Sequence, residues 1–187
     1  MKIILASASP RRRDILENAK IPFEILVSDA DESFDEKDAE KFTLEIAKRK
    51  ALAIENEQDI IISADTAVSI GGEILGKPKD HEDAKRMLTL LSGEMHSVFT
   101  GVCIRQGEKI ISFCEKSDVY FKELSKKEIE NYIESGEPFG KAGAYAIQGL
   151  GALLILKISG DYLNIVGLPM ARLYDVLKND FSFEGSI

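Results

Sequence analysis

The sequence predicts an α/β fold in which helices pack on a mixed β-sheet, and three observations support this prediction. Segments with strand and helix patterns alternate along the chain, with one pair of strands arranged as a hairpin. Hydrophobic residues make up 44% and charged residues 30% of the chain, which is ordinary for a globular protein. The length of 187 residues suits one sizeable core, so we expect a single domain over residues 1–187.

Six segments have the apolar character and the boundaries of strands. They cover residues 2–6, 23–28, 59–70, 96–105, 109–121 and 152–158. Gly71 and Gly72 end the third segment in a turn. The fourth and fifth segments meet at Gln106 and Gly107, which predicts a hairpin.

Five segments have helical patterns or helix boundary signals. The first begins at Pro10, and the second and third cover residues 39–57 and 80–91. The fourth runs from Ser125 to Ser135, and the fifth begins at Pro169 and ends near Lys178. Ser9 before the first of these is typical of a helix N-cap. Asp80 and Asp83 resemble a capping pair, and Ser125 with Glu128 matches a capping box. The acidic stretch 29–40 is an expected loop.

Charge and composition exclude several classes of function. The chain carries 24 basic and 32 acidic residues, a net charge of −8, which gives no general attraction for nucleic acid or an anionic membrane. Its apolar runs are too short to span a bilayer, and the N-terminal stretch is too short for a secretory signal. We therefore expect a cytoplasmic protein that has no membrane or nucleic-acid partner.

The histidines and cysteines give no catalytic or metal-binding pattern. His81 and His96 lie in no ligand spacing, and no nucleophile elbow accompanies them. Cys103 and Cys114 lie on the expected hairpin, where core thiols are commoner than catalytic ones.

A basic cluster at the first strand-to-helix junction predicts a phosphate site. Ser7, Ser9, Arg11, Arg12 and Arg13 surround the expected start of the helix. Cations there oppose the helix dipole, whereas an anion would be bound by backbone N–H groups, hydroxyls and guanidinium groups together. The alternative is a solvated basic face.

Asp65 and Lys50 are charged residues in otherwise apolar patterns. Asp65 interrupts the apolar run of the third strand, where a buried carboxylate requires a cation, a metal or another partner. It would otherwise be a structural residue that caps a turn with Thr66. Lys50 shares the apolar stripe of the 39–57 helix, and either points into a site or extends its ammonium group to water.

Three further positions in expected loops are weaker candidates for site residues. Lys77 follows Gly76 in a stiff loop, and Glu32 belongs to an acidic loop that suits a hard cation such as Mg2+. Gln148 lies in the glycine-rich stretch 141–151, and its amide suits the edge of a base. Ordinary surface loops and a tight structural turn are the alternatives.

Several stretches together resemble the Maf family of nucleoside triphosphate pyrophosphatases. They are LASASPRRRDIL, SADTAVSIGGEILGKP, LLSGEMHSVFTGV, and EPFGKAGAYAIQGLGA followed by VGLP. The resemblance covers nearly the whole chain in the order of the family. It implies an elongated mixed-sheet architecture with a central cleft, as in inosine triphosphate pyrophosphatases, and hydrolysis of nucleoside triphosphates to the monophosphate and pyrophosphate.

The resemblance also implies roles for particular residues. Asp65 corresponds to the proton acceptor, and the residues implied in choosing dTTP and UTP are Arg11, Thr66 and Gln148. Those implied in handling the metal and the phosphates are Glu32, Arg12, Lys50 and Lys77. The sister branch that acts on 7-methyl-GTP carries a glutamate where Gln148 stands. We expect a divalent cation, Mg2+ with Mn2+ or Co2+ as alternatives, held by Glu32 and Asp65.

Two rival functions are also compatible with the sequence. One is a pyrophosphatase of non-standard purine nucleotides. The other is a regulator of septum formation that acts by binding. The family expectation for the assembly is a homodimer.

Overall fold

One seven-stranded sheet runs along the length of the protein, and the expected mixed α/β fold is confirmed. The structure is a computed structural model that describes residues 2–185. The strands are β1 (Ile3–Leu5), β2 (Glu24–Ile25), β3 (Ile60–Ile70), β4 (Glu73–Leu75), β5 (Met95–Gln106), β6 (Lys109–Phe121) and β7 (Ile155–Ser159). Their order is β2-β1-β3-β5-β6-β7, with β4 paired to β3. β1 is parallel to β2 and β3, and all other pairs are antiparallel.

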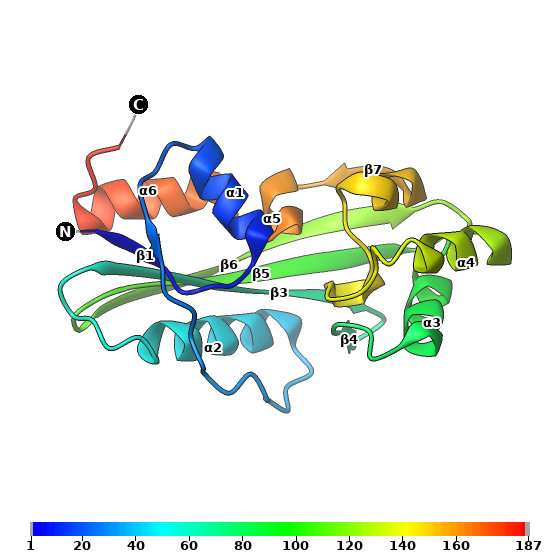
Figure 1. Ribbon diagram of the computed structural model, residues 1–187, viewed down its shortest axis with the longest axis horizontal. Helices are drawn as coiled ribbons and strands as arrows, with labels where there is room; N and C mark the ends of the chain where they lie inside the picture. Colours follow the sequence, from blue (N-terminus) through cyan, green and yellow to red (C-terminus); the bar gives the residue numbers. More distant parts are fainter. Residues whose placement is uncertain (1, 186–187) are drawn as a thin grey trace.

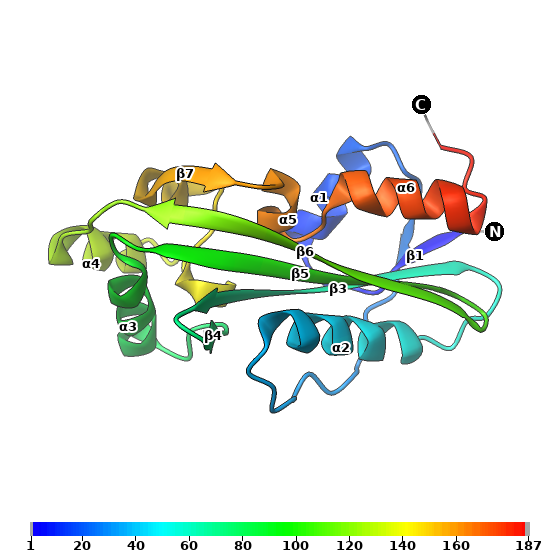
Figure 2. The ribbon, with the colours of Figure 1, turned by 180° about the vertical axis from the view of Figure 1, so that it is seen from behind.

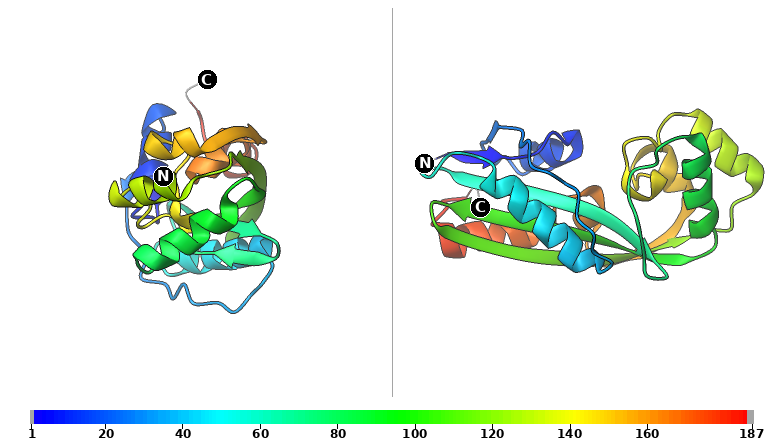
Figure 3. Two further views of the ribbon diagram at one scale, coloured as in Figure 1. Left: turned by 90° about the vertical axis from the view of Figure 1, so that its right-hand side faces the viewer. Right: turned by 90° about the horizontal axis from the view of Figure 1, so that it is seen from below.

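Helices cover both faces of the sheet and one of its ends. They are α1 (Pro10–Asn18), α2 (Ala39–Leu52), α3 (His81–Leu91), α4 (Lys126–Glu134), α5 (Tyr162–Val166) and α6 (Met170–Phe181), with short 3-10 helices η1 (Ala142–Ala144) and η2 (Gly149–Leu154). Helices α1, α5 and α6 lie on one face and α2 lies on the other (Figures 1 and 2). Helices α3 and α4 lie at the end remote from both termini (Figure 3). No helix within residues 2–185 has the length and apolar character needed to cross a membrane.

Alternation along β3 divides its side chains between the two helical layers. Ile60, Ile62 and Ala64 belong to the core under α1 and α6, whereas Ile61 belongs to the core under α2. Each of these isoleucines is fully buried, which stabilises the fold by about 1.5–3 kcal/mol per side chain. The same alternation continues to the polar residues that follow, so neighbours on β3 face opposite layers.

The expected helix starts are confirmed where local capping specifies them. The Asp80 side chain accepts a hydrogen bond from the backbone N–H of Asp83. Both halves of the capping box between Ser125 and Glu128 are present. Ser9 is the N-cap of α1, although its side chain makes no capping bond.

Some element boundaries differ from the expectations because tertiary contacts decide them. Helix α2 ends at Leu52 rather than at residue 57. The buried guanidinium of Arg105 on β5 donates to the carbonyls of Ala51, Ile54 and Asn56, and so satisfies groups that a longer helix would use. The expected strand over 23–28 is reduced to β2, and the one over 152–158 begins at Ile155 because η2 precedes it. β4 and α5 were not predicted.

A buried histidine at the far end of the sheet predicts that stability depends on pH. His96 on β5 is 1% exposed, and its Nε2 atom lies 2.7 Å from the hydroxyl of Tyr145. Burial lowers the pKa of His96 from 6.5 to about 4. Between these two values the unfolded chain binds more protons than the folded chain, so stability falls as the pH drops through that range.

We expect His96→Gln to remove this pH dependence, because glutamine keeps a hydrogen-bonding group but does not titrate. Urea unfolding at about pH 7 and about pH 5 measures the effect, and the wild type should lose about 2 kcal/mol more than the variant. Equal losses in the two proteins would contradict the assignment to His96.

Candidate active site

A cavity of about 500 Å³ opens beside β3. β1 pairs with residues 60–62 of β3 and β4 pairs with residues 68–70. Within the described part of the chain, no strand pairs with the outer edge over residues 63–67. Ten side chains singled out from the sequence all line this cavity: Ser7, Ser9, Arg11, Arg12, Glu32, Lys50, Asp65, Thr66, Lys77 and Gln148.

Arg12 is the buried arginine of the basic cluster at the start of α1, where the sequence predicts a phosphate site. Its side chain emerges from the first turn of α1, and the residue is only 8% exposed. Nη1 donates to Ser7 Oγ at 3.1 Å, and Nη2 donates to Thr66 Oγ1 at 3.0 Å. Burial lowers the pKa of Arg12, an effect that the negative charge of Asp65 opposes. These bonds fix the plane of the guanidinium group before any ligand is bound.

The short helix α5 and the turn after it hold both arginines. Arg12 Nε donates to the carbonyl of Gly167 at 2.8 Å, and Arg11 Nε donates to that of Val166 at 3.3 Å. Gly167 has a φ of 127°, which side chains rarely allow, so the turn that presents these carbonyls requires glycine. Sequence reasoning missed this segment, although the matching stretch VGLP contains the turn.

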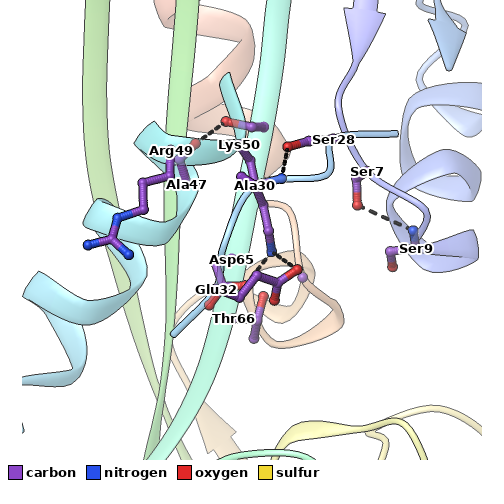
Figure 4. A network of polar contacts seen from close by, with 12 residues as sticks. Ser7, Ser9, Ser28, Ala30, Glu32, Ala47, Arg49, Lys50, Asp65 and Thr66 are labelled. Atoms are coloured by element: carbon purple, nitrogen blue, oxygen red, sulfur yellow. Dashed lines mark hydrogen bonds and ion pairs between the residues drawn. The ribbon is translucent and has the colours of Figure 1, made fainter. Parts of the chain in front are cut away.

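Lys50 lies between two carboxylates rather than extending to water (Figure 4). Its Nζ atom is 2.8 Å from Asp65 Oδ1 and 3.2 Å from Glu32 Oε1. The Lys50 side chain is 11% exposed, so the alternative in which the ammonium extends into solvent is wrong. Asp65 thus faces the α2 layer, whereas the next residue, Thr66, bonds Arg12 on the layer of α1.

Gly101 on β5 allows α2 to approach closely enough for this contact. It is the register partner of Asp65. A Cβ atom at Gly101 would lie 2.4 Å from the backbone carbon of Thr43 in α2, closer than real contacts allow. Any side chain there would push the helix away from the sheet. Sequence reasoning did not identify this glycine.

The glycine-rich stretch forms a loop that carries Gln148 to the rim of the cavity. The carboxylate of Glu137 accepts hydrogen bonds from the backbone N–H groups of Leu150 and Gly151, at 3.0 and 2.9 Å. The hydroxyl of Tyr132 donates to the same carboxylate at 2.9 Å. Tyr132 and Glu137 therefore fix the backbone of this loop after Gln148, and the Gln148 side chain itself stays exposed.

The cavity is positively charged although the chain as a whole is negative. Five basic and two acidic side chains line it, and one of the basic residues, Lys141, was not among the predicted site residues. Burial lowers the pKa of Lys141, and the charge of Arg11 lowers it further. Burial also lowers the pKa of Arg11. Such partly desolvated cations are stabilised by a polyanionic ligand.

The residues present fit a metal ion that takes some of its ligands from the protein and the others from a bound phosphate. Within residues 2–185, no group of three or more histidine, cysteine, aspartate or glutamate side chains is placed to hold a metal ion. Asp65 and Glu32 contact the same ammonium group, so their carboxylates converge on one point. Two carboxylates are what the protein usually supplies to Mg2+, with phosphate oxygens and water completing the shell.

Comparisons with known proteins agree on one family. The family profile described as Maf-like protein matches residues 2–180. A dTTP/UTP pyrophosphatase of Caldanaerobacter subterraneus is 48% identical, over 97% of this chain and 90% of that protein. The dTTP/UTP pyrophosphatase of Thermosipho africanus is 49% identical, over 95% and 92%, and that of Bacillus cereus is 47% identical, over 95% and 94%.

A solved structure shares the fold at much lower identity. The Ham1 protein of Staphylococcus aureus superposes with a TM-score of 0.51 at 12% identity, and covers 83% of this chain and 80% of that chain. At this identity the likeness concerns the fold alone. It agrees with the elongated architecture expected from the sequence.

Proposed function

The chain belongs to the Maf family, and we propose that it hydrolyses dTTP and UTP to the corresponding monophosphate and pyrophosphate. Relatives that carry this name are 46–49% identical over nearly the whole chain. The observation that supports the proposal most strongly is one cavity that is lined by five basic side chains and by the carboxylate of Asp65. Cations bind a triphosphate, and the carboxylate supplies a base next to it.

Binding of the triphosphate uses groups that already point into the cavity. Arg12 is held by three hydrogen bonds, so its remaining N–H groups face the ligand at little entropic cost. Ser7, Ser9 and the exposed start of α1 add hydroxyl and backbone donors. Lys77 also lines the cavity, on a loop that is tied to the glycine-rich stretch by a hydrogen bond from Gly143 N to Gly76 O.

Asp65 activates the attacking water in this proposal. Lys50 donates to Oδ1 of the carboxylate, which leaves Oδ2 to accept the proton. The water attacks the α-phosphorus, the bond from that phosphorus to the bridging oxygen breaks, and pyrophosphate leaves. A divalent cation, for which we infer Mg2+ with Glu32 and Asp65 as protein ligands, neutralises phosphate charge when bound. Arg12, Lys50 and Lys77 stabilise the charge that develops on the phosphates.

Base choice is assigned to Arg11, Thr66 and Gln148, which line the cavity together. We expect Gln148→Glu to weaken the preference for dTTP and UTP more than it weakens hydrolysis in general, because a carboxylate loses the donor half of the amide. The measurement is kcat/KM on a panel of nucleotides. Gln58→Glu, which makes the same charge change outside the cavity, is the control. Equal losses on all nucleotides would contradict a role in base choice.

The proposed activity is tested with the purified protein, Mg2+ and a panel of dTTP, UTP, CTP, GTP, ITP and 7-methyl-GTP. Monophosphate and pyrophosphate, released fastest from dTTP and UTP, are the expected products. Preference for ITP would support the purine alternative, and no turnover of any nucleotide would favour a regulator that acts by binding.

We also infer that the protein does not bind nucleic acid, which its net charge of −8 supports. We further infer a single domain that works in the cytoplasm. A homodimer stays a prediction, which sedimentation or light scattering tests.

A further inference from the structure

A chain of hydrogen bonds runs from Arg12 on α1 across β3 and β5 to α5, on one face of the sheet. Arg12 Nη2 donates to Thr66 Oγ1 at 3.0 Å, and Thr66 Oγ1 lies 2.9 Å from Thr100 Oγ1. Thr100 Oγ1 in turn donates to the backbone carbonyl of Asn164 at 2.9 Å. Thr66 lines the cavity, whereas Thr100 on β5 is fully buried and has no access to a ligand.

The two ends of this chain fix the position of every proton in it. A guanidinium group only donates, and a carbonyl oxygen only accepts. Thr100 has one hydroxyl proton, which the Asn164 carbonyl takes, so Thr100 accepts from Thr66. The proton of Thr66 is therefore committed to Thr100, and one lone pair of Thr66 is committed to Arg12.

Asn164 holds the acceptor end of the chain in place. Its side-chain Nδ2 donates to the carbonyl of Val98 at 3.1 Å and to Ser117 Oγ at 2.9 Å. The residue is fully buried, so α5 is anchored to β5 and β6 at this point. The carbonyl that Thr100 uses cannot move without breaking these bonds.

We propose that Thr100 is a positioning residue that makes the Thr66 hydroxyl an acceptor, and not a donor, toward the substrate. An acceptor oxygen repels phosphate oxygens, so Thr66 recognises a donating group of the nucleotide. Uracil and thymine carry an N–H at ring position 3, where cytosine carries a lone pair. The fixed polarity of Thr66 therefore favours the imide bases over cytosine. This inference rests on the proposed nucleotide hydrolysis.

The test compares UTP with CTP in variants of this chain. Thr100→Val keeps the shape but removes the hydroxyl, which releases the proton of Thr66 to donate to either base. The ratio of kcat/KM for UTP to that for CTP should fall about tenfold, the factor that one hydrogen bond contributes. Thr100→Ser should restore the ratio. Thr43→Val removes a buried hydroxyl that contacts Ala39, Glu40 and Cys114 but takes no part in this chain of hydrogen bonds, so it should leave the ratio unchanged.

A second variant keeps the inference testable if Thr100→Val does not fold. Thr66→Val removes the acceptor itself, so it should lower the same ratio by a similar factor. The double variant should match Thr66→Val alone, because both changes act through one bond. An unchanged ratio in Thr66→Val, or equal losses on UTP and CTP in Thr100→Val, would overturn this inference but not the proposed function. A wild-type protein inactive on both nucleotides would overturn the proposed function as well.

Discussion

Asp65→Asn is expected to lower turnover of dTTP by about a thousandfold, the contribution of a positioned general base. The amide has the shape of the carboxylate and still accepts a hydrogen bond from Lys50 through Oδ1, so the contact that ties α2 to β3 is preserved. The amide cannot take a proton from water at neutral pH. The measurement is kcat at saturating dTTP and Mg2+.

Two controls separate the loss of the base from other effects. Thermal unfolding should show a midpoint close to that of the wild type, because neither packing nor the Lys50 contact is lost. Glu32→Gln changes the other carboxylate on Lys50, which is 54% exposed, and should raise the Mg2+ concentration needed rather than abolish turnover. A near-normal rate in Asp65→Asn would contradict the assignment of the base.

Arg12→Lys is expected to reduce both stability and activity, although the charge is kept. The guanidinium group donates to Ser7, Thr66 and Gly167 in three directions, which a single ammonium group cannot reproduce. The buried acceptors left without donors should destabilise the fold by about 3 kcal/mol. Loss of the fixed guanidinium plane should lower kcat/KM for dTTP by about a hundredfold.

Arg13 provides the matched control in the adjacent position. Its side chain is 47% exposed and pairs with Asp14 and Glu17 in solvent. Arg13→Lys should therefore change stability by less than about 0.5 kcal/mol and leave activity unchanged. Similar effects of the two substitutions, measured by urea unfolding and steady-state kinetics, would show that Arg12 has no special place in the site.

The sequence predicts those features that depend on neighbouring residues. The capping box of α4 and the start of α1 are local, so Ser125, Glu128 and Pro10 suffice to place them. The charged residues that interrupt apolar patterns, Asp65 and Lys50, are likewise visible without a structure. Their pairing is not, because it depends on how closely α2 approaches β3.

Features set by contacts between distant segments cannot be read in the same way. Gly101 and Thr100 lie inside a long strand and look like ordinary strand residues until α2 and α5 are placed against them. Helix α5 has only five residues, too few for a helical period to emerge. The end of α2 depends on Arg105, which is about fifty residues away in the chain.

The central claim is that water activated by Asp65 attacks the α-phosphorus, and isotope labelling tests it most directly. The protein is incubated with dTTP and Mg2+ in water enriched in oxygen-18, and both products are analysed by mass spectrometry. Attack at the α-phosphorus places one labelled oxygen in dTMP and none in pyrophosphate. Label in pyrophosphate, or release of labelled inorganic phosphate with dTDP, would contradict the proposed chemistry.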